Sequence, residues 1–258
     1  MGEQAGTLYK PEESEGGIGM TGQKALGVAK GTSLFALQDE EFKSFTSSLI
    51  PSSRPIIGVR LPLLRSMAKE IAKGDWQTFL QEAPENYYEE VQLKGFVIGY
   101  AKAELSVIFP YITEHIGKID DWSLCDSFCS NLKIVAKNRP FFLSYIEKLS
   151  RCEGEFPQRV AAVLLMDYYL TDTYIDQALA ILDSLKNQKY YCKMAVAWAV
   201  ATAWAKQREK TYYYLQPGNN SLDIWTYRKA IQKMLESRRV SKEDKEYLRQ
   251  LREGLKLE

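Results

Sequence analysis

Residues 121–154, DWSLCDSFCSNLKIVAKNRPFFLSYIEKLSRCEG, decide the fold class of this chain. The apolar side chains in this stretch recur at the spacing of α-helices, and a short joint divides them into a long helical segment and a second one. The stretch follows a break at Gly117 to Asp121 and ends at another break at Gly154. It therefore predicts one pair of packed helices.

The same helix pair recurs along the chain. We expect helices to start near Tyr87, Asp121, Glu155 and Lys189, at intervals of 34 residues. From Leu34 onward the apolar spacing predicts about a dozen helices, without a run of alternating strand residues. A repeated two-helix unit buries its apolar faces on its neighbours, which is the architecture of an α-solenoid. Tetratricopeptide repeats have this length, but their W-x-x-L-G-x-x-Y pattern is missing, so we predict an all-α solenoid of HEAT-like repeats.

The first 33 residues differ in composition from the rest of the chain. They contain half of the sixteen glycines and few large apolar side chains, so burial cannot offset the entropy lost on ordering them. We therefore expect a flexible extension over residues 1–33 and one solenoid domain over residues 34–258. The GIGMTG spacing at residues 17–22 resembles a dinucleotide-binding fingerprint, but no strand precedes it, and we discount that site.

Composition excludes several classes of function. Lys and Arg number 34 against 33 Asp and Glu, so no global field steers the chain toward polyanions. The chain has neither an apolar run long enough to span a membrane nor a secretory signal pattern, and we expect a cytoplasmic protein, nucleoid-associated in a bacterium. The chain has one histidine, His115, and four scattered cysteines. These residues argue against a zinc site and against a Ser-His-Asp triad. We expect Cys125 and Cys129 to pack in the core, and we predict no metal and no cofactor.

Stacked helix pairs line a shared concave groove with the inner helices of successive units, and three units place an unusual side chain there. Trp122 and Asp126 are four residues apart and project from one helical face, while Arg159 and Trp198 lie in the next two units. These four residues are the candidate catalytic site. Two alternatives remain open at this point: the tryptophans can be core residues, and Asp126 can form a purely structural ion pair with Arg159.

Local charge favours a polyanion in the same groove. Basic side chains gather in residues 54–73, 186–210 and 225–242, while acidic ones lie elsewhere, as in a surface that binds phosphates. The candidate DNA-binding residues are Arg60, Arg65, Lys193, Lys206, Arg228, Lys229, Lys233 and Arg238. The alternative is that these helix faces are merely solvated.

Six motifs, taken in order, resemble the DNA alkylation repair proteins, which are AlkD-like DNA glycosylases built from HEAT-like repeats. The motifs are GVRLPLLRSMAKEI at 58–71, YYEE at 87–90, DWSLCD at 121–126, RVAAV at 159–163, KMAVAWA at 193–199 and YRKAIQK at 227–233. The resemblance covers residues 34–258. The chain departs from some relatives at Ala201, where they carry an arginine that contacts phosphate.

The resemblance implies a lesion-facing cleft formed by Trp122, Trp198, Asp126 and Arg159. It also implies removal of 3-methyladenine and 7-methylguanine from double-stranded DNA by an enzyme that does not flip the base. We expect the protein to be a monomer. The residues suit this chemistry, because a cationic alkylpurine leaves without a strong acid and a carboxylate can stabilise the sugar cation and place a water molecule. The alternatives are a non-catalytic module that binds damaged or branched DNA, and a protein-binding helical scaffold.

Overall fold

The computed structural model describes residues 34–254, and within that range it contains fourteen α-helices, one 3-10 helix and no strand. The prediction of an all-α fold is confirmed for this part of the chain. Residues 1–33, for which we predicted a flexible extension, lie outside the described residues, as do residues 255–258. None of the described helices combines the length and the apolar character that crossing a membrane requires.

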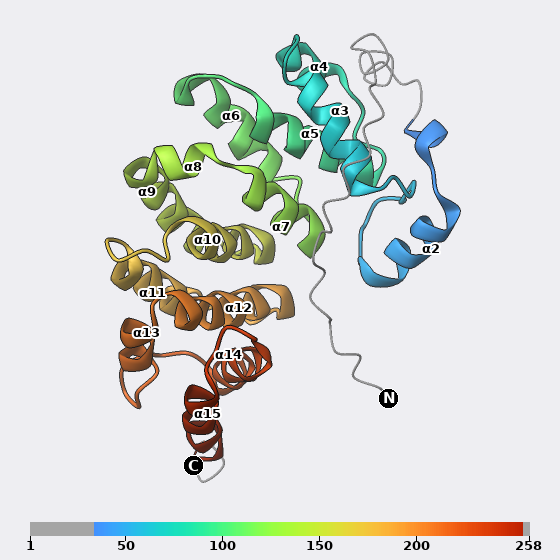
Figure 1. The fold of residues 1–258 in the computed structure, drawn as a ribbon. Helices are drawn as coiled ribbons and strands as arrows, with labels where there is room; N and C mark the ends of the chain where they lie inside the picture. The colour runs from blue at the N-terminus through green and yellow to red at the C-terminus, as the bar shows by residue number, and fades with distance from the viewer. Residues whose placement is uncertain (1–33, 255–258) are drawn as a thin grey trace.

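The helices form two layers that follow an arc (Figure 1). The inner layer consists of α3 (Leu61–Ile71), α5 (Tyr88–Tyr100), α7 (Trp122–Asn131), α10 (Glu155–Tyr168), α12 (Tyr190–Lys206) and α14 (Ile224–Glu236), each packed on the next. The outer layer consists of α4 (Trp76–Glu82), α6 (Leu105–Ile116), α9 (Arg139–Ser150), α11 (Ile175–Ser184) and α13 (Arg208–Tyr214). The remaining elements are η1 (Phe35–Leu37), α2 (Glu40–Leu49), α8 (Ile134–Lys137) and α15 (Lys242–Gly254). The arc opens on the side where α2 lies, so the inner layer lines its concave side (Figure 1).

The starts of the inner helices confirm the predicted repeat. Their N-caps are Tyr87, Asp121, Gly154, Lys189 and Asp223, so the intervals are 34, 33, 35 and 34 residues. Two of these caps explain why the helices begin there: the Asp121 carboxylate accepts hydrogen bonds from the Ser123 and Leu124 amides, and Asp223 accepts from the Trp225 and Thr226 amides. These bonds satisfy amide groups that a helix start otherwise leaves unpaired.

Hydrogen bonds between residues about one repeat apart join neighbouring units. The Tyr88 hydroxyl donates to Ser123 Oγ at 2.7 Å, 35 residues away, and the Asn187 side-chain amide donates to the Glu153 carbonyl at 2.9 Å, 34 residues away. Lys210 pairs with Asp176 at 2.8 Å, again 34 residues away. Polar contacts as well as apolar packing thus join neighbouring units.

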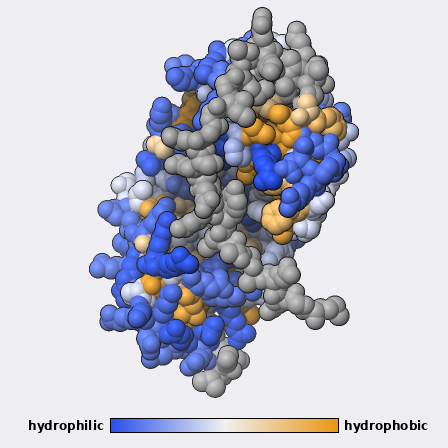
Figure 2. Space-filling model, turned by 45° about the vertical axis from the view of Figure 1, so that its right-hand side comes forward, coloured by the Kyte–Doolittle hydropathy of each residue, from blue (hydrophilic) through white to orange (hydrophobic). Residues whose placement is uncertain are grey.

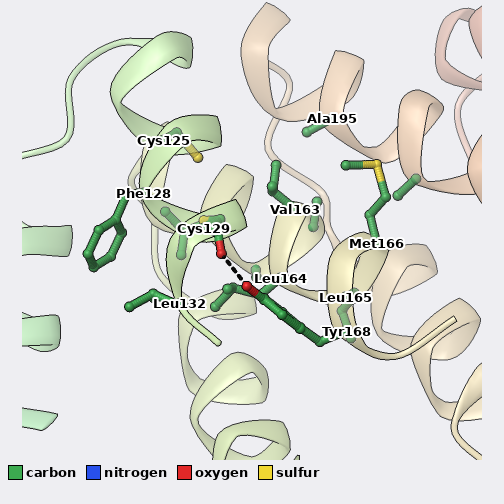
Figure 3. Packing of buried hydrophobic residues seen from close by; sticks show 14 of the residues in the cluster. Cys125, Phe128, Cys129, Leu132, Val163, Leu164, Leu165, Met166, Tyr168 and Ala195 are labelled. Atoms are coloured by element: carbon green, nitrogen blue, oxygen red, sulfur yellow. Dashed lines mark hydrogen bonds between the residues drawn. The ribbon is translucent and has the colours of Figure 1, made fainter. Parts of the chain in front are cut away.

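The core lies between the inner helices and against the outer layer. Small side chains such as Ala162, Ala195 and Ala199 are fully buried and let α10 and α12 approach closely. Figure 3 shows the packing between α7 and α10, where the Tyr168 hydroxyl donates to the Cys129 carbonyl at 2.8 Å. Cys125 and Cys129 are buried free thiols, which confirms their predicted place in the core.

Candidate functional site

Helix α7 places Trp122 and Asp126 on its partly exposed face. Trp122 is the first residue of the helix, directly after the Asp121 cap, and Asp126 follows one turn later. The partly or fully exposed residues of α7 are Trp122, Ser123, Asp126, Ser127 and Ser130. Leu124, Cys125 and Phe128 face the core instead. The Trp122 indole nitrogen donates to the Leu49 carbonyl at 3.4 Å, so this ring contacts the end of α2.

Asp126 forms a two-point ion pair with Arg159 of the next inner helix. Arg159 Nε donates to Asp126 Oδ1 at 3.1 Å, and Arg159 Nη2 donates to Asp126 Oδ2 at 2.8 Å. The third guanidinium nitrogen, Nη1, donates to the Tyr191 carbonyl at 2.7 Å. Arg159 therefore connects α7, α10 and α12. The fork geometry fixes the orientation of the carboxylate more firmly than a single contact would.

Burial shapes the electrostatics of this pair. The Arg159 side chain is 5% exposed and the Asp126 side chain 21%, so Asp126 is the more accessible member of the pair. Burial raises the pKa of Asp126 above its ordinary value, although the Arg159 guanidinium acts in the opposite direction. Burial disfavours the charged form of Arg159, but attraction to Asp126 outweighs it and raises the pKa of the guanidinium.

Trp198 lies one turn further along its own helix than Asp126 and Arg159 lie along theirs. Asp126 and Arg159 are each the fifth residue of their helices, whereas Trp198 is the ninth residue of α12. We define the inner stripe of α10 and α12 as the fifth, ninth and thirteenth residues of each helix. The inner stripe consists of Arg159, Val163 and Asp167 on α10, and of Met194, Trp198 and Thr202 on α12. All three α12 members are partly exposed, so Trp198 is not sealed in the core, whereas Ala201 is buried and adds nothing to the groove surface.

The candidate DNA-binding residues near the N-terminal end of the arc already have partners. Arg60 pairs with Asp39 at 2.8 Å, and its guanidinium lies 5.0 Å from the centre of the Phe42 ring. Arg65 donates to the Tyr100 hydroxyl at 3.3 Å and lies over the Phe96 ring at 4.5 Å. Both arginines thus also hold α3 against its neighbours.

Two of the candidates on α12 and α14, Lys193 and Lys229, lie near the Trp225 ring. The Lys193 ammonium lies 5.1 Å from the centre of the Trp225 ring and pairs with Asp223 at 2.8 Å, and the Lys229 ammonium lies 5.9 Å from the same ring. Burial lowers the pKa of Lys233, which is half-buried. Arg228, Arg238 and Lys206 are exposed. Figure 2, which brings the open side of the arc forward, shows mainly hydrophilic side chains over this C-terminal half where other atoms do not cover it.

Two acidic residues matter more in the structure than the sequence indicated. Glu89 is fully buried, and its carboxylate accepts hydrogen bonds from the Ile57, Gly58 and Val59 amides at 2.8, 2.7 and 3.2 Å, which anchors the segment leading into α3. Asp167 lies on the inner stripe of α10 and has a buried oxygen without a hydrogen-bond partner. The sequence offers one signal for Asp167: it is an acidic residue directly after the apolar run VAAVLLM at 160–166, two helical turns after Arg159.

A family model described as DNA alkylation repair enzyme matches residues 32–234, a range that contains Trp122, Asp126, Arg159 and Trp198. No curated protein matches the chain. Within the described residues, no group of three or more His, Cys, Asp or Glu side chains is placed to hold a metal ion.

Proposed function

Because the chain belongs to the DNA alkylation repair enzyme family, we propose that it is a monofunctional glycosylase that excises positively charged alkylpurines from double-stranded DNA. Its substrates are 3-methyladenine and 7-methylguanine, and it hydrolyses their N-glycosidic bond. It acts as a monomer in the cytoplasm and needs no metal or cofactor.

The observation that carries this proposal is the oriented carboxylate of Asp126. Two hydrogen bonds from Arg159 fix its position, and the carboxylate is the accessible member of the pair. An alkylated purine that already carries a positive charge leaves without a strong general acid. The remaining task is to hold a water molecule against the sugar carbon and to accept its proton, which an oriented carboxylate can do.

The other candidate residues have supporting roles in this proposal. Arg159 is a positioning residue, because its side chain is almost completely buried and acts on the substrate only through Asp126. Trp122 on α7 and Trp198 on α12 are assigned to contact the deoxyribose and to exclude water from it. The basic residues of α12 and α14 bind backbone phosphates and set the register of the duplex.

Base release from methylated DNA tests the proposal. The wild-type protein should release 7-methylguanine in excess EDTA, and Asp126→Asn should lower the single-turnover rate by about 100-fold while duplex binding is retained. Asp176→Asn makes the same change of charge on the outer helix α11, where the side chain is 68% exposed, and should release base at the wild-type rate. Equal release by the wild type and Asp126→Asn would reject the assignment of Asp126.

One observation favours a second function, a non-catalytic module that recognises damaged or branched DNA. Both oxygens of Asp126 accept hydrogen bonds from Arg159, as they would in an ion pair with a structural role alone. This alternative expects salt-sensitive binding to damaged DNA without release of a base. The same assay therefore separates the two functions.

A further inference from the structure

The Asp126–Arg159 pair has no net charge. Each carboxylate oxygen of Asp126 accepts a hydrogen bond from the guanidinium, so the two charges largely cancel beyond the pair itself. The proposed substrate is a cationic purine, and positive charge also develops on its sugar as the bond breaks. A neutral pair can orient a water molecule, but it supplies little attraction for a cation. The groove therefore needs another source of negative charge.

Asp167 occupies a suitable position. It is the thirteenth residue of α10, two turns after Arg159 on the inner stripe, with Val163 between them. Asp167 is partly exposed, whereas Leu164, Leu165 and Met166 before it and Tyr168 after it are buried. Burial raises the pKa of Asp167 to about 6, and the nearby charge of Asp126 contributes to the rise. Asp167 is thus a partly exposed acid on the same helix as Arg159, close enough to Asp126 for the two charges to interact.

The carboxylate of Asp167 is unpaired. Its Oδ2 atom is buried without a hydrogen-bond partner, and Asp167 is in none of the ion pairs of the described residues, although Lys206 and Lys133 are near enough to lower its pKa. The two nearby lysines have other contacts: Lys206 donates to the Met166 carbonyl at 3.5 Å, and the Lys133 ammonium lies 5.8 Å from the centre of the Tyr168 ring. A buried polar atom without a partner costs stability, and such atoms tend to be kept where a ligand satisfies them.

We propose that Asp167 is the carboxylate that attracts the positive charge of the alkylated base and of the developing sugar cation. This inference rests on the proposed glycosylase function. In this inference Asp126, held by Arg159, places the water molecule, and Asp167 supplies a negative charge that is not part of an ion pair.

Two abasic-site duplexes test the role of Asp167. One carries a cationic pyrrolidine analogue of the sugar and the other a neutral tetrahydrofuran analogue of the same shape. At pH 7.5 the wild type should bind the cationic duplex at least about tenfold more tightly, a difference of about 1.4 kcal/mol. Asp167→Asn should keep its affinity for the neutral duplex and lose this preference. Asp167→Glu, which retains the charge, should retain the preference, and Asp176→Asn on the outer layer should match the wild type.

The pH dependence gives a second readout. The wild-type preference should disappear as the pH falls from 7.5 to 5, because Asp167 becomes protonated near pH 6. The ionisable groups near it are Asp126 and Cys129 from α7, Lys133 from the start of α8 and Lys206 from the end of α12. Asp167→Asn should bind the two duplexes equally at every pH.

The outcomes separate the two proposals. Wild-type release of 7-methylguanine together with an undiminished preference in Asp167→Asn would overturn the role of Asp167 and leave the glycosylase proposal standing. If the wild type neither releases base nor prefers the cationic duplex, both proposals fail. Asp167→Ser serves as a second neutral variant if Asp167→Asn does not fold, and it must lose the same preference for the inference to hold.

Discussion

Arg159 is the residue on which the geometry of the candidate site depends most. Its three donor nitrogens contact Asp126 and the Tyr191 carbonyl, so one side chain connects three inner helices. The sequence suggested both a site and an ion pair for these residues. It could not show that the guanidinium is the buried partner and the carboxylate the accessible one, because that depends on how α7, α10 and α12 pack.

Replacing Arg159 by Met should reduce both stability and activity. The change leaves the Asp126 carboxylate largely buried without a counter-charge, and we expect the free energy of unfolding to fall by about 3 kcal/mol. Base release should fall by about 100-fold, because the carboxylate loses its orientation. Urea unfolding and single-turnover release measure the two effects. The double variant Asp126→Asn/Arg159→Met should regain part of the stability, and a double variant less stable than Arg159→Met alone would contradict this account.

Base release should decline as the pH falls, because Asp126 must be ionised to accept a proton. Burial raises the pKa of Asp126 above 3.8, the ordinary aspartate value, so the loss of activity should begin at a higher pH than for an exposed carboxyl. DNA containing 7-methylguanine is a suitable substrate, because its positive charge is permanent. A rate that stays level down to about pH 4, where an ordinary aspartate titrates, would exclude Asp126 as the group that must be ionised.

His115, the single histidine of the chain, should remain neutral in the folded protein well below pH 6. Complete burial lowers its pKa to about 3, with Lys118 contributing next. The unfolded chain binds a proton at this side chain near pH 6.5, so His115 should reduce stability progressively as the pH falls from 6.5 toward 3. Because only one imidazole is present, its NMR chemical shift gives the titration directly. A midpoint near 6.5 in the folded protein would refute the prediction.

At the scale of single elements, helix starts were predictable and the anchoring of α3 was not. Asp39 and Asp121 cap their helices with carboxylates that directly precede the first turn, and such local signals can be recognised in a sequence. Glu89 accepts hydrogen bonds from amides about 30 residues earlier in the chain, and no local sequence pattern predicts this contact. Gly58, one of the three residues it binds, has a φ of 95°, a backbone conformation that favours glycine.

Glu89→Gln should weaken the connection between α2 and α3. A glutamine can accept at one oxygen only, so some of the three amides lose their partner in a buried place. The expected loss is about 1 to 3 kcal/mol in the free energy of unfolding. Hydrogen exchange should accelerate at Ile57, Gly58 and Val59 before it does in α10. Glu82→Gln, at an exposed position of α4, is the matched control and should change neither quantity.

At the scale of the whole molecule, the repeat was predictable because each unit buries the same kind of face. Intervals of 33 to 35 residues between N-caps match the predicted 34. The assignment of charges to the groove was harder to foresee. Arg60 and Arg65 hold α3 in place, and Lys193 forms an ion pair with Asp223. The partners of these basic residues come from neighbouring elements and lie far away in sequence.

Lys229 should contribute to DNA affinity through phosphate contact rather than through recognition of the lesion. We expect Lys229→Ala to weaken binding to damaged and undamaged duplexes equally and to reduce the slope of log affinity against log salt concentration by about one. Lys210→Ala removes the same charge from α13 in the outer layer and should leave the slope unchanged. A loss confined to damaged DNA would show that Lys229 contacts the lesion instead.

The bridge from Asp126 through Arg159 to Tyr191 has a mechanical consequence for the arc. A solenoid bends by small rotations at each junction between units, since every unit touches only its neighbours. The bridge crosses two consecutive junctions, from α7 to α10 and from α10 to α12, at the middle of the molecule. These junctions should be the stiffest, and curvature should vary mainly toward the two ends. A duplex could then be clasped or released by the ends while the centre keeps its shape.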